Sequence, residues 1–287
     1  MKPPANQPST TAHQPLSAAK KIFVHGWATD SRVWREFIKD PSRTAGGPAR
    51  PAGGGEDAVA VNLPGHGDWP SGHDNQPAGG KKWDSPTFAP AIEALLGSAP
   101  DSIGIGWSLG GEILMHLAST NAVRFRGLIL VSTTPSFIER DGFPWAQKKA
   151  RVKKMLADMG KNPAETLKRF YALNFTEEEF LTARAKGFLK LYSGHPQSAL
   201  NYDYDGLTLA LKALMDADLR DGLRKITVPT LIMHGSLDNV CPIGAAHYLK
   251  ENITGATLRI FEGAGHAPFI TRPEEFSKAV SGFTEGI

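Results

Sequence analysis

Short apolar segments typical of β-strands alternate with segments of helical spacing along most of this 287-residue chain. Residues 127–131, Gly-Leu-Ile-Leu-Val, are apolar throughout, which is typical of a strand buried on both faces. Comparable runs lie at 21–24, 58–61, 103–107, 228–233 and 256–261. Because strands that alternate with helices pair in parallel, the pattern predicts an α/β fold: a mostly parallel sheet flanked by helices.

One long segment interrupts this alternation. Residues 137–222 have helical spacing, many charges and little strand signal, and they predict a helical cap inserted over one end of the sheet. The core is then expected at 20–136 and 223–287. Residues 1–19 are rich in proline and polar side chains, without the apolar stretch of a secretion signal, and predict a disordered tail. Two stretches rich in proline and glycine, 41–55 and 68–86, predict surface loops of unassigned role.

Composition excludes several classes of protein. The chain is 41% hydrophobic, enough for a large core, yet it has no apolar run of about 18 residues that would predict a membrane span. A net charge of +3 is too balanced to indicate a nucleic-acid partner. A single cysteine, Cys241, precludes an internal disulfide and, with no secretion signal, favours the cytoplasm. No metal-ligand spacing, phosphate-binding loop or dinucleotide fingerprint is present, so we expect no metal and no cofactor.

The sequence Gly106-Trp107-Ser108-Leu109-Gly110 is a G-x-S-x-G motif between a predicted strand and a predicted helix. Small neighbours let the chain reverse sharply, so that the Ser108 hydroxyl is presented at the carboxyl edge of the sheet. The helix amino terminus directs backbone N–H groups to the same place, and the N–H of Leu109 is a candidate donor to an oxyanion. The alternative is a glycine-rich turn with an inert serine.

A serine hydroxyl needs a base, and the base needs an orienting acid. His266 and Asp238 each follow one of the last two predicted strands, so both are expected at the edge that carries Ser108. The alternatives are a turn-forming aspartate and a solvent-facing histidine. Trp27, in the loop after the first strand, is the candidate second oxyanion donor, or else a core tryptophan.

These residues resemble the α/β-hydrolase superfamily and, within it, the pimeloyl-[acyl-carrier protein] methyl ester esterases of biotin synthesis. The similarity rests on the segments 25–27, 63–67, 106–111, 218–220 and 265–270. It implies Ser108 as nucleophile, Asp238 as orienting acid and His266 as general base, with Trp27 and Leu109 on the oxyanion side.

The resemblance also implies an acyl site in the cap and a carrier protein as partner. The acyl site would be lined by Phe170, Tyr171, Ala172, Leu173 and Asn174. Arg169 would contact the carrier, with Arg184 and Lys186 as weaker candidates. Residues 140–169 contain nine basic and three acidic side chains, which suits an acidic carrier, although a solvated helix face would look the same.

The sequence therefore predicts a serine carboxylic-ester hydrolase acting on an acyl substrate presented by an acidic acyl-carrier protein, without nucleic-acid or membrane partners. Two alternatives remain open at this point. One is a carbon–carbon bond hydrolase of diketones, or a lactonase, with the same fold. The other is a non-catalytic binding module. Acyl chain length, carrier identity and oligomeric state are left open.

Overall fold

The computed structural model describes four parts of the chain: residues 21–38, 58–67, 101–193 and 203–287. The predicted tail at 1–19 and the predicted loops at 41–55 and 68–86 lie outside these described residues.

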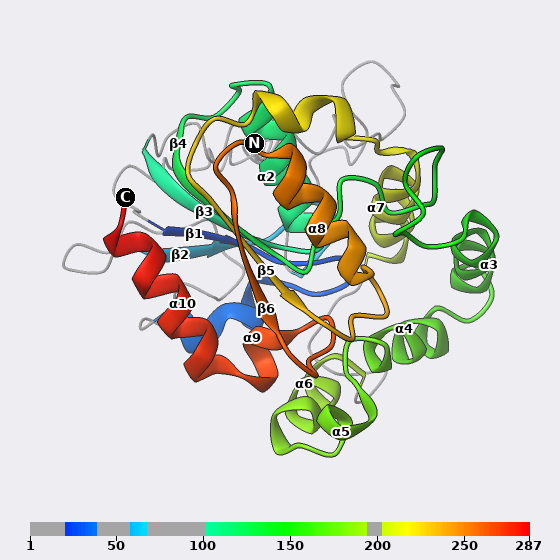
Figure 1. The fold of residues 1–287 in the computed structure, drawn as a ribbon. Helices are drawn as coiled ribbons and strands as arrows, with labels where there is room; N and C mark the ends of the chain where they lie inside the picture. Colours follow the sequence, from blue (N-terminus) through cyan, green and yellow to red (C-terminus); the bar gives the residue numbers. More distant parts are fainter. Residues whose placement is uncertain (1–20, 39–57, 68–100, 194–202) are drawn as a thin grey trace, which may run out of the picture.

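Within the described residues, six strands form one sheet in which every pair is parallel (Figure 1). The order across the sheet is β2-β1-β3-β4-β5-β6. The strands are β1 (Lys21–Val24), β2 (Ala58–Val61), β3 (Ser102–Trp107), β4 (Phe125–Val131), β5 (Thr230–Gly235) and β6 (Thr257–Phe261). The central strands β3 and β5 are buried at every position, as their apolar sequences predict. The predicted α/β class is confirmed.

Helices cover both faces of the sheet (Figure 1). On one face lie α2 (Leu109–Ser119) and α8 (Ile243–Asn252), and on the other lie the 3-10 helix η1 (Ser31–Phe37), α9 (Pro268–Thr271) and α10 (Pro273–Glu285). The Asp30 carboxylate accepts a hydrogen bond from the backbone N–H of Arg32 and so caps the start of η1.

An aromatic cluster joins η1 to α9 and α10. The Trp34 ring is fully buried and stacks on Phe269, with ring centroids 4.3 Å apart, and Phe276 lies 6.3 Å away. Burial of each such side chain contributes about 1.5–3 kcal/mol. Because Phe269 is three residues beyond His266, this cluster anchors one end of the loop that carries the histidine.

Between β4 and β5 the chain forms a run of helices, five α-helices followed by a 3-10 helix, all within described residues. They are α3 (Lys149–Met159), α4 (Pro163–Ala172), α5 (Glu177–Phe180), α6 (Ala183–Ser193), α7 (Tyr204–Asp216) and η3 (Arg220–Lys225). Figure 1 shows α3 to α6 gathered together beside the sheet, near the carboxyl end of β6. We call residues 137–222 the insert. That these residues form a separate cap with these bounds stays a prediction.

Candidate functional site

Ser108 is the single residue between β3 and α2. Its backbone has φ 53° and ψ −117°, a conformation that costs a non-glycine residue on the order of 1–3 kcal/mol. Hydrogen bonds hold it there: its N–H donates to the Val131 carbonyl at 2.9 Å, and its carbonyl accepts from Gly111 N at 2.9 Å and from Thr133 Oγ1 at 2.7 Å. The strand–turn–helix context predicted for the motif is therefore present.

The turn requires a residue without a side chain at position 106. A Cβ placed on Gly106 would lie 2.6 Å from the carbonyl carbon and oxygen of Gly110. Since real Cβ atoms do not approach backbone so closely, the tight reversal and the bare glycine depend on each other.

Asp238 and His266 form a buried hydrogen-bonded pair. Nδ1 of His266 lies 2.7 Å from Oδ2 of Asp238, and both side chains are at most 1% exposed. The other carboxylate oxygen of Asp238 accepts from the backbone N–H groups of Val240 and Cys241, each at 2.8 Å. The structure thus brings together the predicted acid and the predicted base, from the loops after β5 and β6.

A second imidazole, which sequence reasoning did not assign, faces the same carboxylate. Nε2 of His234 lies 2.7 Å from the Cys241 carbonyl and 3.3 Å from Oδ2 of Asp238. Because a carbonyl only accepts, Nε2 of His234 carries the proton. Burial lowers the pKa of His234, so its ring is neutral near pH 7. It therefore fixes the Asp238 loop without supplying a charge.

His266 lies beside the nucleophile turn. The indole N–H of Trp107 donates to the His266 carbonyl at 2.8 Å, and the two rings are 5.4 Å apart. Nε2 of His266 is buried and has no hydrogen-bond partner within the described residues, so the structure shows no bond from it to the Ser108 hydroxyl. The free ring nitrogen is the acceptor that a general base requires.

The two predicted oxyanion donors both lie close to Ser108. Leu109 is the next residue, and the loop of Trp27 is close because a Cβ on Gly26 would lie 3.3 Å from Cβ of Ser108. Within the described residues, the backbone N–H of neither Leu109 nor Trp27 donates to another backbone or side-chain acceptor. The Trp27 side chain is buried, and its indole N–H donates to the Leu207 carbonyl at 2.8 Å.

The predicted acyl-site residues at the end of α4 pack against the loop after β1. The Phe170 ring meets the Trp27 ring edge-on at 4.8 Å, and the Tyr171 hydroxyl donates to the Ala28 carbonyl at 2.6 Å. Ala172 and Leu173 are partly exposed. Asn174 is buried, and its side-chain amide donates back to the carbonyls of the preceding turn.

The histidines at the ends of β1 and β2 are structural neighbours of the site. Nδ1 of His25 donates to the Gly26 carbonyl at 2.8 Å, and Nε2 accepts from Leu63 N at 3.0 Å. Burial lowers the pKa of His25 to about 4, and burial together with the nearby His25 lowers that of His66 to about 3. Both rings are neutral near pH 7 and brace the loops that follow these strands.

Unpaired basic side chains concentrate on α3 and α4. Arg169, 58% exposed on its side chain, forms an ion pair with Asp158 at 3.5 Å, and Lys154 pairs with the same carboxylate at 2.8 Å. Four exposed lysines nearby form no ion pair with a described residue: Lys149, Lys153, Lys161 and Lys168. Helices α3 and α4, with the turn between them, therefore present a positive surface to solvent.

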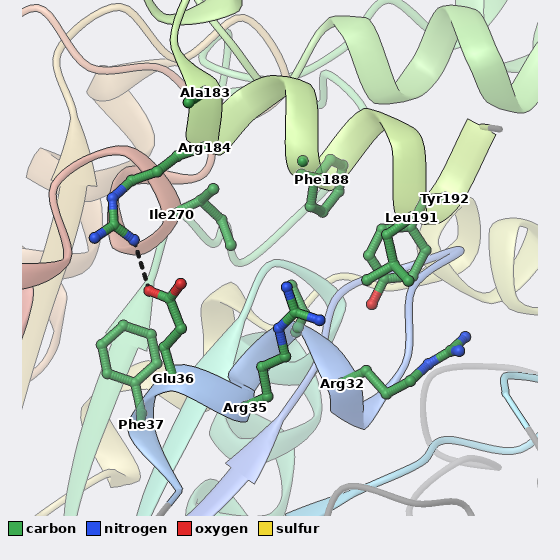
Figure 2. A pocket seen from close by; sticks show the side chains of 12 residues that line it. Arg32, Arg35, Glu36, Phe37, Ala183, Arg184, Phe188, Leu191, Tyr192 and Ile270 are labelled. Atoms are coloured by element: carbon green, nitrogen blue, oxygen red, sulfur yellow. Dashed lines mark hydrogen bonds and ion pairs between the residues drawn. The ribbon is translucent and has the colours of Figure 1, made fainter. Parts of the chain in front are cut away.

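A pocket of about 360 Å³ lies between η1 and α6 (Figure 2). Arg184 crosses its rim to pair with Glu36 at 2.7 Å and also approaches Glu274, so its charge is already balanced. Ile270 and Phe188 line its floor, but none of the predicted catalytic residues does. This pocket is separate from the candidate site.

The buried thiol of Cys241 follows Asp238 closely but shows no sign of reactivity. Burial raises its pKa well above the usual range, with the Asp238 carboxylate adding to the effect. A thiol in such surroundings is not a nucleophile near pH 7. No helix in the described parts of the chain is both long and apolar enough to cross a bilayer.

Comparison with known proteins agrees with this geometry. The profile of a family described as the alpha/beta hydrolase family matches residues 22–279. A pimeloyl-[acyl-carrier protein] methyl ester esterase of Nitrosomonas europaea is 29% identical, over 89% of this chain and 91% of that protein. One of the same name from Chromobacterium violaceum is 32% identical, over 77% and 81%. A solved esterase from Exiguobacterium antarcticum superposes with a TM-score of 0.74 at 26% identity, covering 95% of this chain and 94% of that one. The resemblance expected from the sequence is confirmed.

Proposed function

We propose that this chain, which belongs to the α/β-hydrolase family, is a serine carboxylic-ester hydrolase that removes the methyl ester from a pimeloyl group carried by an acyl-carrier protein. The observation that carries the proposal is the buried Asp238–His266 pair beside a strained serine turn. The proposed substrate rests on the names of the relatives. The proposed reaction type is supported by the Asp238–His266 pair and the serine turn.

In the proposed mechanism, Nε2 of His266 takes the proton of the Ser108 hydroxyl as the oxygen attacks the ester carbonyl. Asp238 accepts from Nδ1–H, which leaves Nε2 as the basic nitrogen and stabilises the imidazolium. The serine–histidine hydrogen bond is not formed here, and such bonds commonly tighten only when substrate binds.

The tetrahedral oxyanion is then held by the unpaired N–H groups of Leu109 and Trp27. Methanol leaves with the proton from His266, and water, activated by the same nitrogen, cleaves the acyl-enzyme. Loss of one oxyanion donor typically lowers kcat about 100- to 1000-fold.

The first experiment tests the nucleophile. Ser108→Ala is expected to abolish hydrolysis of a short p-nitrophenyl ester and covalent labelling by a fluorophosphonate. Ser119→Ala, at the far end of the same helix, is the matched control and should retain both. Retained turnover in the Ser108 variant would remove the serine mechanism, and a wild-type protein that is neither labelled nor active would favour a binding module.

The second experiment tests the substrate class. Turnover of pimeloyl-carrier methyl ester is compared with that of a ring-fission diketone and of an enol-lactone. Preference for either of the last two would replace the esterase assignment by one of the alternatives of the same fold. Complementation of a strain that requires biotin because it lacks its own esterase, with Ser108→Ala as control, tests the assignment in cells.

The carrier contact is tested through the positive surface of the insert. The double variant Lys149→Glu, Lys153→Glu is expected to raise KM for the carrier-linked ester several-fold, since it reverses two unpaired charges that would attract an acidic carrier. The KM for a free p-nitrophenyl ester should not change. Equal effects on both substrates, or none on the carrier-linked ester, would assign these lysines to a solvated face.

A further inference from the structure

One carboxylate of the insert is buried although its neighbours are exposed. Glu179 is 6% exposed, whereas Glu177 and Glu178 on the same short helix face solvent. A buried carboxylate is costly unless hydrogen bonds compensate it. The hydrogen-bond partners of the Glu179 carboxylate therefore indicate which contacts compensate its burial.

The hydrogen bonds of Glu179 reach the histidine loop. Oε2 accepts from Thr176 N at 3.0 Å, which closes a capping box at the start of α5. The same oxygen accepts from Gly265 N at 2.8 Å, and Oε1 accepts from the Thr271 hydroxyl. Only the first of these bonds is needed to cap the helix, so the other two bind the loop on both sides of His266.

The fit between the insert and the loop is close. A Cβ on Gly265 would lie 2.8 Å from the Asn174 carbonyl oxygen and 3.0 Å from Oε2 of Glu179. The next residue, His266, donates its backbone N–H to that Asn174 carbonyl at 2.9 Å. Two consecutive amides of the histidine loop are thus held by one turn of the insert.

We infer that Glu179 is a positioning residue for the general base: it holds the backbone at Gly265 and Thr271 so that the His266 ring keeps its direction between Asp238 and Ser108. The inference rests on the function proposed above. Hydrogen bonds to a charged acceptor are stronger than those between neutral groups. A displacement of about 1 Å in a catalytic group can lower the rate about 100-fold.

The test variant is Glu179→Gln, because the amide keeps the volume but replaces one accepting oxygen by an N–H₂ group that cannot accept. We expect kcat for a p-nitrophenyl ester to fall about 10- to 100-fold, with KM changed less than about two-fold. The rate of fluorophosphonate labelling of Ser108 should fall in parallel. Glu178→Gln makes the same change of charge at the adjacent exposed position and should behave as wild type.

A pH profile separates positioning from a general loss of structure. If the His266 ring loses its direction, the pH profile of kcat/KM is expected to differ between Glu179→Gln and the wild type, whereas a variant that is only less stable keeps the wild-type profile. If this variant does not fold, Thr271→Val removes only the contact to Oε1 and is expected to lower kcat by about three-fold or more.

The outcomes separate the inference from the function on which it rests. A folded Glu179→Gln variant with wild-type kcat, labelling rate and pH profile overturns the positioning role while Ser108-dependent activity stands. A Thr271→Val variant with wild-type kcat does the same if the glutamine variant is unfolded. Activity that persists in Ser108→Ala instead overturns the proposed function.

Discussion

The buried, neutral state of His25 predicts a loss of stability in acid. Protonation of Nε2 would break the bond from Leu63 N, and burial already holds the pKa of His25 at about 4, against about 6.5 for an accessible histidine. The folded-state pKa is therefore the lower one. The stabilising contribution is complete above pH 6.5 and is lost as pH falls towards 4.

The expected magnitude follows from the difference in pKa. Two units, from pH 6.5 to 4.5, at 1.36 kcal/mol per unit amount to about 3 kcal/mol. Urea unfolding followed by tryptophan fluorescence at pH 7.5 and 4.5 measures it, with His25→Gln as the variant that cannot titrate.

The variant should be less stable at pH 7.5, because its packing and its bond to Leu63 are altered. On acidification to pH 4.5, its free energy of unfolding should fall by about 2–3 kcal/mol less than that of the wild type. His66, whose ring lies 5.2 Å away, stays buried in both proteins, so the part of its loss in acid that comes from burial cancels in the comparison. Parallel losses in wild type and variant would refute the reasoning.

Three further predictions concern buried positions. Burial raises the pKa of Glu112 well above its usual value, so the stability of the wild type falls as pH rises from about 4.5 through the folded-state pKa. The difference in Tm between Glu112→Gln and the wild type should therefore favour the variant more at pH 8 than at pH 5. Trp34→Ala should cost about 3–5 kcal/mol in urea unfolding because its stacked partner Phe269 loses contact, and a cost below 1 kcal/mol would contradict the packing described. Gly106→Ala should remove fluorophosphonate labelling, since the new Cβ meets the next turn of backbone; labelling at the wild-type rate would show that the turn tolerates a side chain.

The strands and the nucleophile turn could be predicted from sequence because their causes are local. Apolar runs predicted each described strand, and the glycines around Ser108 predicted the turn. Where a strand begins later than expected, there is a physical reason. The strand expected at 228–233 forms at Thr230–Gly235, after Pro229, which has no N–H to donate to the neighbouring strand. The pairing of Asp238 with His266 was also predictable, because carboxyl ends of parallel strands share one edge.

The support of the site was not predictable in the same way. The sequence Thr176-x-x-Glu179 signals the start of a helix, but nothing local indicates that the same carboxylate binds an amide 86 positions further along. The contact of His234 with Asp238 likewise depends on how the loop after β5 closes. Such contacts are set by tertiary placement, which neither spacing nor propensity encodes.

The turn from Asn174 to Glu179 does not behave as a detachable cover. If it swung outward, the amides of Gly265 and His266 would lose their acceptors, Oε2 of Glu179 and the Asn174 carbonyl. A different insert placed on this scaffold would have to supply these two acceptors, or the backbone at Gly265 and His266 would lose the contacts that hold it.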